Sequence, residues 1–395
     1  MSQQSAPRDA AEAARAAFAS VEGKPFPDDI FTAPQLTWAV IGCGVIANQM
    51  ASTLKLAGRK LAGIYNRTHE KAVAFAEKYG VARVYDTLEE LCADPAIDAV
   101  YITTPHNTHI HYLRAALSAG KHVLCEKAIT LNSEELNEAR AIADEHGVQL
   151  IDATTILHMP LYRELIRRAE KDEFGNMSIA QVSFGSYKDF DPENRFYNPR
   201  LAGGAMLDIG VYALTMARMF MLSQPEDVVS IANACNTGVD VTSGIVMRNP
   251  DMQMAVISLT LHSKQPKRAV LSFENCYIEV MDYPRADRAT IVWTATGERE
   301  EVHVGEEAYA LAYEVADLEK AVAGDRVEDA MIVFAADVMD LMTQLRRTWR
   351  IYYPEEAELA AAAGCRVAGE YVSPAGRASG RARPQALLSP SPFSK

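Results

Sequence analysis

The sequence has few cysteines and no pattern that pairs them. Its six cysteines, among 395 residues, are scattered and include no CxxC pair, which favours neither a zinc site nor a disulfide framework. It also lacks an apolar run of about 18 residues, so no membrane-spanning helix is expected. Residues 1–14 lack the apolar core of a secretory signal. These absences together predict a reduced, cytoplasmic protein.

Positive charge is also scarce. The chain has 39 Lys and Arg against 52 Asp and Glu, for a formal net charge of -13. Phosphate attraction needs basic surface, so we expect neither a general nucleic-acid binder nor a protein of anionic membranes. A single anionic cofactor needs only one locally positive pocket and stays compatible with this charge. Hydrophobic residues make up 49% of the chain, which suffices for a sizeable core.

The chain divides into two structured parts and two ends. Strand-like and helix-like segments alternate over residues 37–150, which predicts a doubly wound parallel sheet, and we place this Rossmann domain at 35–152. Longer β-branched runs without helical crossovers follow, and they predict an α+β domain with an antiparallel or mixed sheet at 153–350. We expect residues 1–34 to form an arm and residues 371–395 a disordered tail.

A glycine-rich turn follows the first expected strand. Residues 42–47 read Gly-Cys-Gly-Val-Ile-Ala, which fits G-x-G-x-x-A between a strand and a helix. In that setting Gly42 permits the tight turn, Gly44 lets the backbone approach a pyrophosphate, and the helix N-terminus attracts the phosphates. The alternative is an ordinary turn. We assign to the cofactor Gly42, Cys43, Gly44, Val45 and Ile46.

The end of the second expected strand favours NADP over NAD. An NAD enzyme places a carboxylate there for the ribose hydroxyls, but Asn66, Arg67 and Thr68 occupy this stretch. Arg67 and Thr68 suit a 2′-phosphate, because a guanidinium pairs with phosphate through two hydrogen bonds. The alternatives are NAD binding and a solvated surface arginine.

Further motifs carry a family resemblance. Thr-Thr-Pro-His-Asn-Thr-His occupies 103–109, Glu-Lys occupies 126–127, and Gly-Gly-Ala-Met-Leu-Asp-Ile-Gly-Val-Tyr occupies 203–212. With the glycine turn, this succession resembles the glucose–fructose oxidoreductase, inositol dehydrogenase and rhizopine catabolism (Gfo/Idh/MocA) family over about residues 37–350. Asn198-Pro199 and Tyr212 resemble its dihydrodiol dehydrogenase, xylose dehydrogenase and glucose–fructose oxidoreductase branch. Ala128 departs from the family's proline after the lysine, which puts the placement of Lys127 in question.

The resemblance implies an architecture and an activity. A Rossmann domain would join an open, mostly antiparallel sheet with helices on one face, and the substrate would lie between that face and the nicotinamide. The implied reaction is hydride transfer between the cofactor and a sugar, sugar derivative or cyclic vicinal diol. Members of the family commonly pair through the sheet, which implies a homodimer or homotetramer.

The resemblance also places Lys127, Asp208 and Tyr212 at the reacting carbon. Hydride transfer to or from an alcohol carbon must be matched by proton transfer at its oxygen. We expect Tyr212 to be the proton donor or acceptor, and Asp208, four residues earlier, to face the same side of a helix and orient the substrate. Burial and a cationic ring are expected to lower the pKa of Lys127. Taken singly, a surface lysine, a half-buried tyrosine and a helix-start carboxylate are the simpler interpretations.

Other candidates flank these three. The resemblance assigns Glu126 to the nicotinamide ribose. Residues after the strand that ends at Thr103 lie where doubly wound sheets bind ligands, and we assign four of them to the cofactor: Thr104, Pro105, Asn107 and His109. Arg195, with Phe196 and Tyr197, is assigned to the substrate, although an ordinary polar loop would read the same way. His109 and His111 have no third ligand at a convincing spacing, so no metal site is expected.

A second function stays open. Some members of this family are regulatory proteins that bind the cofactor and a partner without turnover. The presence of Lys127, Asp208 and Tyr212 together favours an enzyme, since a binder has no need of all three.

Overall fold

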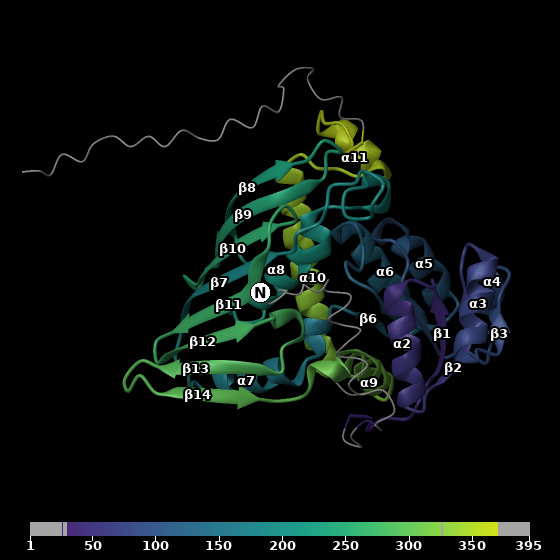
Figure 1. The fold of residues 1–395 in the computed structure, drawn as a ribbon, viewed down its shortest axis with the longest axis horizontal. Helices are drawn as coiled ribbons and strands as arrows, with labels where there is room; N and C mark the ends of the chain where they lie inside the picture. The colour runs from purple at the N-terminus through teal and green to yellow at the C-terminus, as the bar shows by residue number, and fades with distance from the viewer. Residues whose placement is uncertain (1–25, 27–29, 325–326, 370–395) are drawn as a thin grey trace, which may run out of the picture.

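Two β-sheets with helices between and around them form the protein (Figure 1). The computed structural model describes residue 26 and the ranges 30–324 and 327–369. Most of the expected arm at 1–34 and all of the expected tail at 371–395 lie outside these residues. No helix in the described part of the chain combines the length and apolar character needed to cross a membrane.

The first sheet is wholly parallel and has the strand order β3-β2-β1-β4-β5-β6. This is the doubly wound parallel sheet that was expected, in the Rossmann strand order, with a reversal of that order between β1 and β4, where ligands of such sheets bind. Its strands are β1 (Thr37–Ile41), β2 (Lys60–Tyr65), β3 (Arg83–Val84), β4 (Ala99–Ile102), β5 (His122–Cys125) and β6 (Leu150–Asp152). Its helices are α2 (Val45–Leu56), α3 (His69–Tyr79), α4 (Leu88–Ala93), η1 (His106–Thr108), α5 (His109–Ser118) and α6 (Ser133–His146).

The second sheet has the order β14-β13-β12-β11-β7-β10-β9-β8. Its neighbours run antiparallel except β10 and β7, which run parallel, as the expectation of a mostly antiparallel sheet requires. Its strands are β7 (Met177–Gly185), β8 (Asp227–Ala234), β9 (Asp240–Arg248), β10 (Met254–Thr260), β11 (Gln265–Phe273), β12 (Cys276–Met281), β13 (Arg288–Trp293) and β14 (Arg299–His303).

One face of the second sheet is buried beneath helices. Alternate side chains of β10 are buried, such as Ala255, Ile257 and Leu259, and in Figure 1 α8 and α10 separate this sheet from the first. The helices of this part are α7 (Pro160–Glu170), the π-helical turn η4 (Met206–Gly210), α8 (Val211–Arg218) and α10 (Val327–Thr348), with short turns η2 (Thr155–His158), η3 (Pro199–Leu201) and η5 (Tyr283–Arg285).

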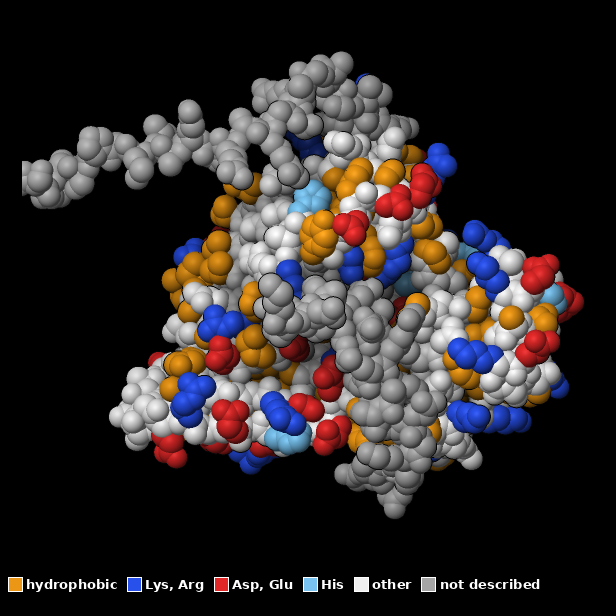
Figure 2. Space-filling model, viewed as in Figure 1, with side chains coloured by type: hydrophobic (Ala, Val, Ile, Leu, Met, Phe, Trp, Pro, Cys, Tyr) orange, Lys and Arg blue, Asp and Glu red, His pale blue; other side chains and the backbone are white. Residues whose placement is uncertain are grey.

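The opposite face of this sheet is apolar at its β8 end. Val229 and Ile231 are 74% and 77% exposed, and the register aligns Val229 with Val246 and Val246 with Val256 across three strands. Figure 2 shows hydrophobic side chains along the edge where Figure 1 labels β8, β9 and β10. Surface like this is typical of a contact with another protein.

The chain then returns to the first sheet. After η6 (Glu307–Tyr309), helix α9 (Ala310–Val322) buries Leu311, Val315 and Leu318 in a core shared with β1 and β4. On the same helix Glu319 forms a buried ion pair with Arg59 at 2.7 Å. One face of the first sheet is therefore covered by a helix that follows the second sheet in the sequence. This helix joins the two domains.

Residues 351–369 also belong to the fold, although the expected second domain ended at 350. They form η7 (Pro354–Glu356) and α11 (Ala357–Ala362). The phenol of Tyr353, which is fully buried, donates a 2.6 Å hydrogen bond to the carbonyl of Gly203. The backbone of Gly369 donates to Thr237 at 2.8 Å. This segment thus supports the glycine pair that leads into η4.

Candidate active site

The glycine turn after β1 has the geometry that a dinucleotide requires. Gly42 has a φ of +99°, and a Cβ there would lie 2.6 Å from the hydroxyl oxygen of Thr103. Gly44 begins α2, and a Cβ on it would meet nothing within 4 Å. Helix α2 has no side-chain cap and no acidic residue in its first turn, so its N–H groups stay available for an anion. The residues present therefore fit a pyrophosphate.

Cys43, Val45 and Ile46 lie beside this opening. Val45 is 52% exposed, and Cys43 and Ile46 are half-buried. Burial raises the pKa of the Cys43 thiol, and the nearby ammonium of Lys71 opposes that shift. Lys71 thus brings positive charge to the turn. The sequence analysis missed it, and its position near the start of α3 was the only signal.

The end of β2 presents exposed polar side chains. Arg67 and Thr68 are exposed, and Thr68 begins α3 without capping it through its side chain. Asn66 is half-buried and donates a 2.9 Å hydrogen bond to the carbonyl of Thr68. Asn66 therefore shapes the turn, while Arg67 and Thr68 are free to meet a ligand phosphate.

Of the residues assigned after β4, two are held by the protein itself. His109 is fully buried, with one ring nitrogen 2.7 Å from the carbonyl of Thr104 and the other 3.0 Å from that of Ala128. Asn107 donates to the carbonyl of Arg200 at 3.0 Å and to Glu355 at 2.6 Å. Both therefore fix the backbone at this edge of the sheet.

Thr104 and Pro105 remain at the surface of this edge. Thr104 is half-buried and accepts a 2.8 Å hydrogen bond from the hydroxyl of Thr108, and Pro105 is exposed. Both therefore keep exposed surface at this edge of the sheet.

Lys127 and Asp208 meet where the two sheets face each other. Lys127 follows β5 and Asp208 lies in η4. The ammonium of Lys127 donates to the Asp208 carbonyl at 2.6 Å and to its carboxylate at 3.1 Å. Their side chains are 14% and 12% exposed. The side chain of Lys127 thus bridges the two domains, although the family's proline is replaced by Ala128.

Tyr212 completes this group. The Lys127 ammonium lies 5.0 Å from the centre of the Tyr212 ring. Burial raises the pKa of the Tyr212 phenol, and Lys127 acts against that shift. The sequence predicted one helix carrying both Asp208 and Tyr212, but Asp208 is in the π-helical turn and Tyr212 in α8. The two still reach Lys127 together.

The pKa of Lys127 differs from the expectation. Burial was expected to lower its pKa, and burial does oppose the charged form, but Asp208 more than offsets it and the pKa of Lys127 is raised. In turn, burial acts against the Asp208 carboxylate, and Lys127 and Arg195 outweigh it and lower its pKa. The expected lowering is therefore wrong for the protein without a cofactor, because sequence spacing did not show that Asp208 pairs with the lysine.

Arg195 and His106 border the same group. A guanidinium nitrogen of the exposed Arg195 lies 3.5 Å from the Asp208 carboxylate. His106 is 9% exposed, and burial together with the charges of His109 and Lys127 lowers its pKa to about 3, which keeps the ring neutral. Sequence reasoning gave His106 no role. Its position inside the 103–109 motif was the available signal.

The two neighbours of Arg195 have different surroundings. Phe196 is half-buried beneath Arg195, whose guanidinium carbon lies 4.3 Å from the ring centre. Tyr197 is fully buried, and its phenol donates to the carbonyl of Lys188 at 2.9 Å. Tyr197 therefore holds the loop, while Phe196 packs beneath Arg195 and stays partly exposed.

A group of possible metal ligands lies at the edge of the second sheet. Asp287, His303 and Glu306 place their ligand atoms within 4.8 Å of one another at the β14 edge. The His109 nitrogens are already engaged by carbonyl oxygens.

Comparison with known proteins identifies the family. The description "Oxidoreductase family, NAD-binding Rossmann fold" matches residues 36–153, and "GFO/IDH/MocA C-terminal domain" matches residues 162–280. The chain is an NAD(P)-binding oxidoreductase. It belongs to the Gfo/Idh/MocA family, as the motifs indicated.

Similar proteins include two curated enzymes. Trans-1,2-dihydrobenzene-1,2-diol dehydrogenase of Mus musculus is 30% identical over 241 residues, 60% of this chain and 72% of the relative. A scyllo-inositol 2-dehydrogenase (NADP⁺) of Bacillus subtilis is 27% identical over 330 residues, 81% of this chain and 99% of the relative. The structure of a 3-ketoreductase from Actinomadura kijaniata with NADP has a TM-score of 0.68 at 21% identity, covering 80% of this chain and 97% of that one; it shows the shared fold.

Proposed function

We propose that the protein transfers a hydride between NADP and a CH–OH carbon of a sugar, a sugar derivative or a cyclic vicinal diol. The observation that carries this proposal is the convergence of Lys127, Asp208 and Tyr212 at one point, at the carboxyl edge of the first sheet. The substrates of the mouse and B. subtilis relatives, a dihydrodiol and an inositol, support the substrate class.

The bound nicotinamide would supply or accept the hydride, and the protein would manage the proton at the substrate oxygen. Tyr212, neutral because its pKa is raised, donates a proton to a carbonyl oxygen during reduction and takes one back during oxidation. Lys127 stabilises the phenolate and the developing negative charge on the substrate oxygen. Asp208 keeps Lys127 charged and in place. Exposed Arg195 is positioned to hold another substrate hydroxyl.

Activity on a panel tests this proposal. Purified protein is mixed with NADP⁺ or NADPH and a set of sugars, inositols and cyclic diols or their ketones, and absorbance of the reduced cofactor is followed. We expect turnover with at least one compound. Tight cofactor binding without turnover across the panel would contradict the enzyme and support the regulatory alternative.

Arg67 is proposed to select NADP by pairing with the 2′-phosphate. A charge-assisted pair contributes about 1.5–3 kcal/mol, so Arg67→Ala is expected to raise the Kd for NADP⁺ by about 10- to 100-fold. The Kd for NAD⁺ should stay nearly unchanged, because that cofactor lacks the phosphate. Binding is measured by fluorescence titration, with Arg299→Ala, an exposed arginine on β14, as the control. An equal loss for both cofactors would show that Arg67 does not read the phosphate.

The apolar outer face of the second sheet is proposed as the contact of a homodimer or homotetramer. Val256 lies in this face at 37% exposure. Val256→Lys would bury an unpaired charge in such a contact, which costs several kcal/mol, so we expect the oligomer to dissociate. Light scattering after size-exclusion chromatography measures the mass, and Leu359→Lys on α11 serves as the control. A wild-type protein that is already monomeric would refute the proposal.

A further inference from the structure

A cluster of buried ionisable side chains surrounds Glu126, the residue before Lys127. Glu126 directly follows β5. The phenol of Tyr101 donates to one of its carboxyl oxygens, and the Lys127 backbone donates to the other at 3.3 Å. Helix α9 packs against β5 and contributes Glu314, whose charge interacts with Glu126. The carboxyl groups of Glu126 and Glu314, from distant parts of the chain, therefore both lie where α9 packs against β5.

Glu314 is unusual because its carboxyl group is buried without a partner. The residue is fully buried, and neither carboxyl oxygen accepts a hydrogen bond with good geometry; the hydroxyl of Thr155 is close enough to ease its ionisation slightly. A buried carboxylate without hydrogen bonds is costly, and such a group retains its proton instead.

Ionisable groups of both signs surround the pair. The ionisable groups acting on Glu126 or Glu314 are Tyr101, Cys125, Lys127, Asp152, His158, Tyr212 and Arg285. Of these cations, Lys127 pairs with Asp208 at 3.1 Å and His158 pairs with Asp317 at 2.7 Å. Each of these two carboxylates also meets an arginine, Arg195 at Asp208 and Arg163 at Asp317. Arg285 acts on both Glu126 and Glu314.

The direction of the pKa shifts agrees with a proton retained by this buried pair. Burial and the charge of Glu126 raise the pKa of Glu314 to about 8, and burial raises that of Glu126. Closely coupled carboxyls of this kind titrate as a pair. A group that is protonated near neutral pH but close to its pKa responds strongly to any charge placed beside it.

We propose that Glu314 and Glu126 hold one shared proton in the cofactor-free protein and that Glu314 releases it when a cation binds next to Lys127. The inference rests on the proposed function, which puts the nicotinamide ring at Lys127 and Tyr212. The oxidised ring is cationic and the reduced ring is neutral. Binding of NADP⁺ is therefore coupled to proton release, and binding of NADPH is not. Glu314 acts through Glu126 and is a positioning residue.

Isothermal titration calorimetry tests this coupling without turnover. NADP⁺ and NADPH are each titrated into the full chain at pH 7.5 in two buffers of different ionisation enthalpy, which yields the number of protons released. At this pH Glu314 is mostly protonated and Asp152, whose pKa is about 6, is already ionised. We expect NADP⁺ to release about 0.5–0.8 proton more than NADPH. Any proton from the shared 2′-phosphate cancels in this difference.

Glu314→Gln keeps the shape and removes the titrating group, so the difference should vanish. Glu307→Gln, an exposed carboxyl that also faces Arg285, is the matched control and should keep the wild-type value. A difference that persists in Glu314→Gln assigns the proton to another group, such as Lys127, and overturns the inference. Equal proton release by both cofactors in the wild type overturns it as well. Failure of both cofactors to bind would instead contradict the proposed function.

A measurement on the wild type alone covers the case in which Glu314→Gln does not fold. If one proton leaves on binding of NADP⁺, its affinity relative to NADPH rises as the pH approaches 8, by up to about tenfold per pH unit. The ratio of the two Kd values between pH 6 and 8 should therefore change by at least about fivefold. A ratio independent of pH would refute the proposal.

Discussion

Lys127→Ala is expected to lower kcat by about 10²- to 10⁴-fold, the range that a positioned acid–base or charge-stabilising group contributes. The reason is structural: Lys127 is the cation within reach of both Asp208 and Tyr212. Removing it leaves the phenolate and the substrate oxygen without a countercharge. The loss is measured by steady-state kinetics on a substrate found in the panel.

Tyr212→Phe should cause a loss of similar size, because the ring stays and only the proton-carrying oxygen is removed. The double variant should be hardly slower than either single one, since residues that act as a unit give non-additive losses. The Kd for NADPH is expected to change little in all three. Lys171→Ala on the surface after α7 and Tyr277→Phe on β12 are the matched controls. Retention of more than a tenth of the wild-type kcat in Lys127→Ala would remove this residue from the chemistry.

The pH dependence of the reaction rate also tests the roles of Lys127 and Tyr212. Burial raises the pKa of Tyr212 and that of Lys127 is raised by Asp208. Both groups are therefore protonated at neutral pH, the form required to reduce a carbonyl. The rate of carbonyl reduction should fall as the pH rises toward these raised pKa values, which lie above the ordinary 10.0 for Tyr212 and 10.5 for Lys127. The rate of alcohol oxidation should increase as the pH rises toward the same values.

The fold was predictable because its signals are local. The alternation of strands and helices over 37–150, with the turn at Gly42 and Gly44, predicted the doubly wound parallel sheet that the structure has. β-branched runs specified the second sheet. The exception is β14, whose sequence Arg-Glu-Glu-Val-His lacks an apolar period; it is an edge strand with one partner, where charge is tolerated and limits edge-to-edge association.

The site was only partly predictable, because pairing across the two sheets is not a local property. Sequence motifs placed Lys127, Asp208 and Tyr212 together, but the pKa of Lys127 depends on its contact with Asp208, 81 positions away. Helical spacing also failed to predict the π-helical turn at Met206–Gly210. The carboxyl of Asp240, from β9, accepts a 2.6 Å hydrogen bond from the Met206 backbone at the start of that turn, a support that only the tertiary structure provides.

Glu314 shows the same limit. Within helix α9 it stands in an ordinary amphipathic pattern, and neither neighbour spacing nor composition marks it. Its significance arises from β5 and η2, which pack against the helix and bring Glu126 and His158 near its carboxyl. Buried ionisable groups of this kind become visible only when elements from both ends of the chain are in place.

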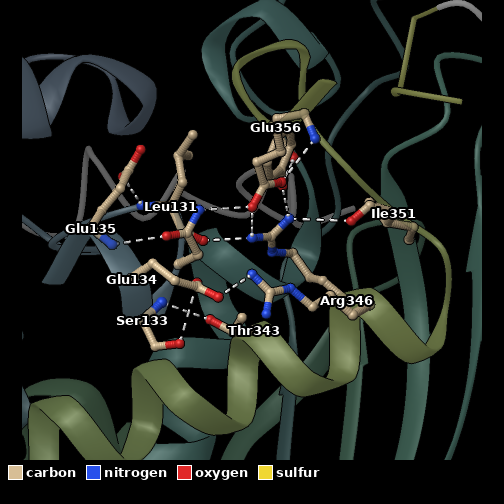
Figure 3. A network of polar contacts seen from close by, with 12 residues as sticks. Leu131, Ser133, Glu134, Glu135, Thr343, Arg346, Ile351 and Glu356 are labelled. Carbon is tan, nitrogen blue, oxygen red and sulfur yellow. Dashed lines mark hydrogen bonds and ion pairs between the residues drawn. The ribbon is translucent and has the colours of Figure 1, made fainter. Parts of the chain in front are cut away.

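The C-terminal segment, by contrast, depends on one buried ion pair. Arg346 of α10 is 1% exposed and binds both oxygens of Glu356 at 2.8 and 2.9 Å. The same guanidinium donates to the carbonyls of Leu131 and Ile351, and Glu356 also accepts from Asn132 at 3.0 Å (Figure 3). The pair thus joins α10, the start of α6 and η7 in one network.

Glu356→Ala is expected to destabilise the protein by about 3–5 kcal/mol, because it leaves the Arg346 charge buried without a partner. For a chain of this size that corresponds to a fall in Tm of about 4–6 °C by calorimetry. Arg346→Met should cost a similar amount by leaving the carboxylate unpaired. The double variant Arg346→Met with Glu356→Leu removes both charges, and we expect it to be more stable than either single variant.

Acid conditions provide the second readout for this pair. Burial would favour the protonated form of Glu356, but Arg346 outweighs it and holds the pKa below its ordinary value of 4.5. Stability from the pair is therefore present above pH 4.5 and is lost as the pH falls through the lower pKa of the folded state. The double variant lacks this carboxyl, so its Tm should fall less steeply than that of the wild type in that range. Equal acid sensitivity, or strictly additive losses in the double variant, would show that the two residues act independently and that the network does not hold the C-terminal segment in place.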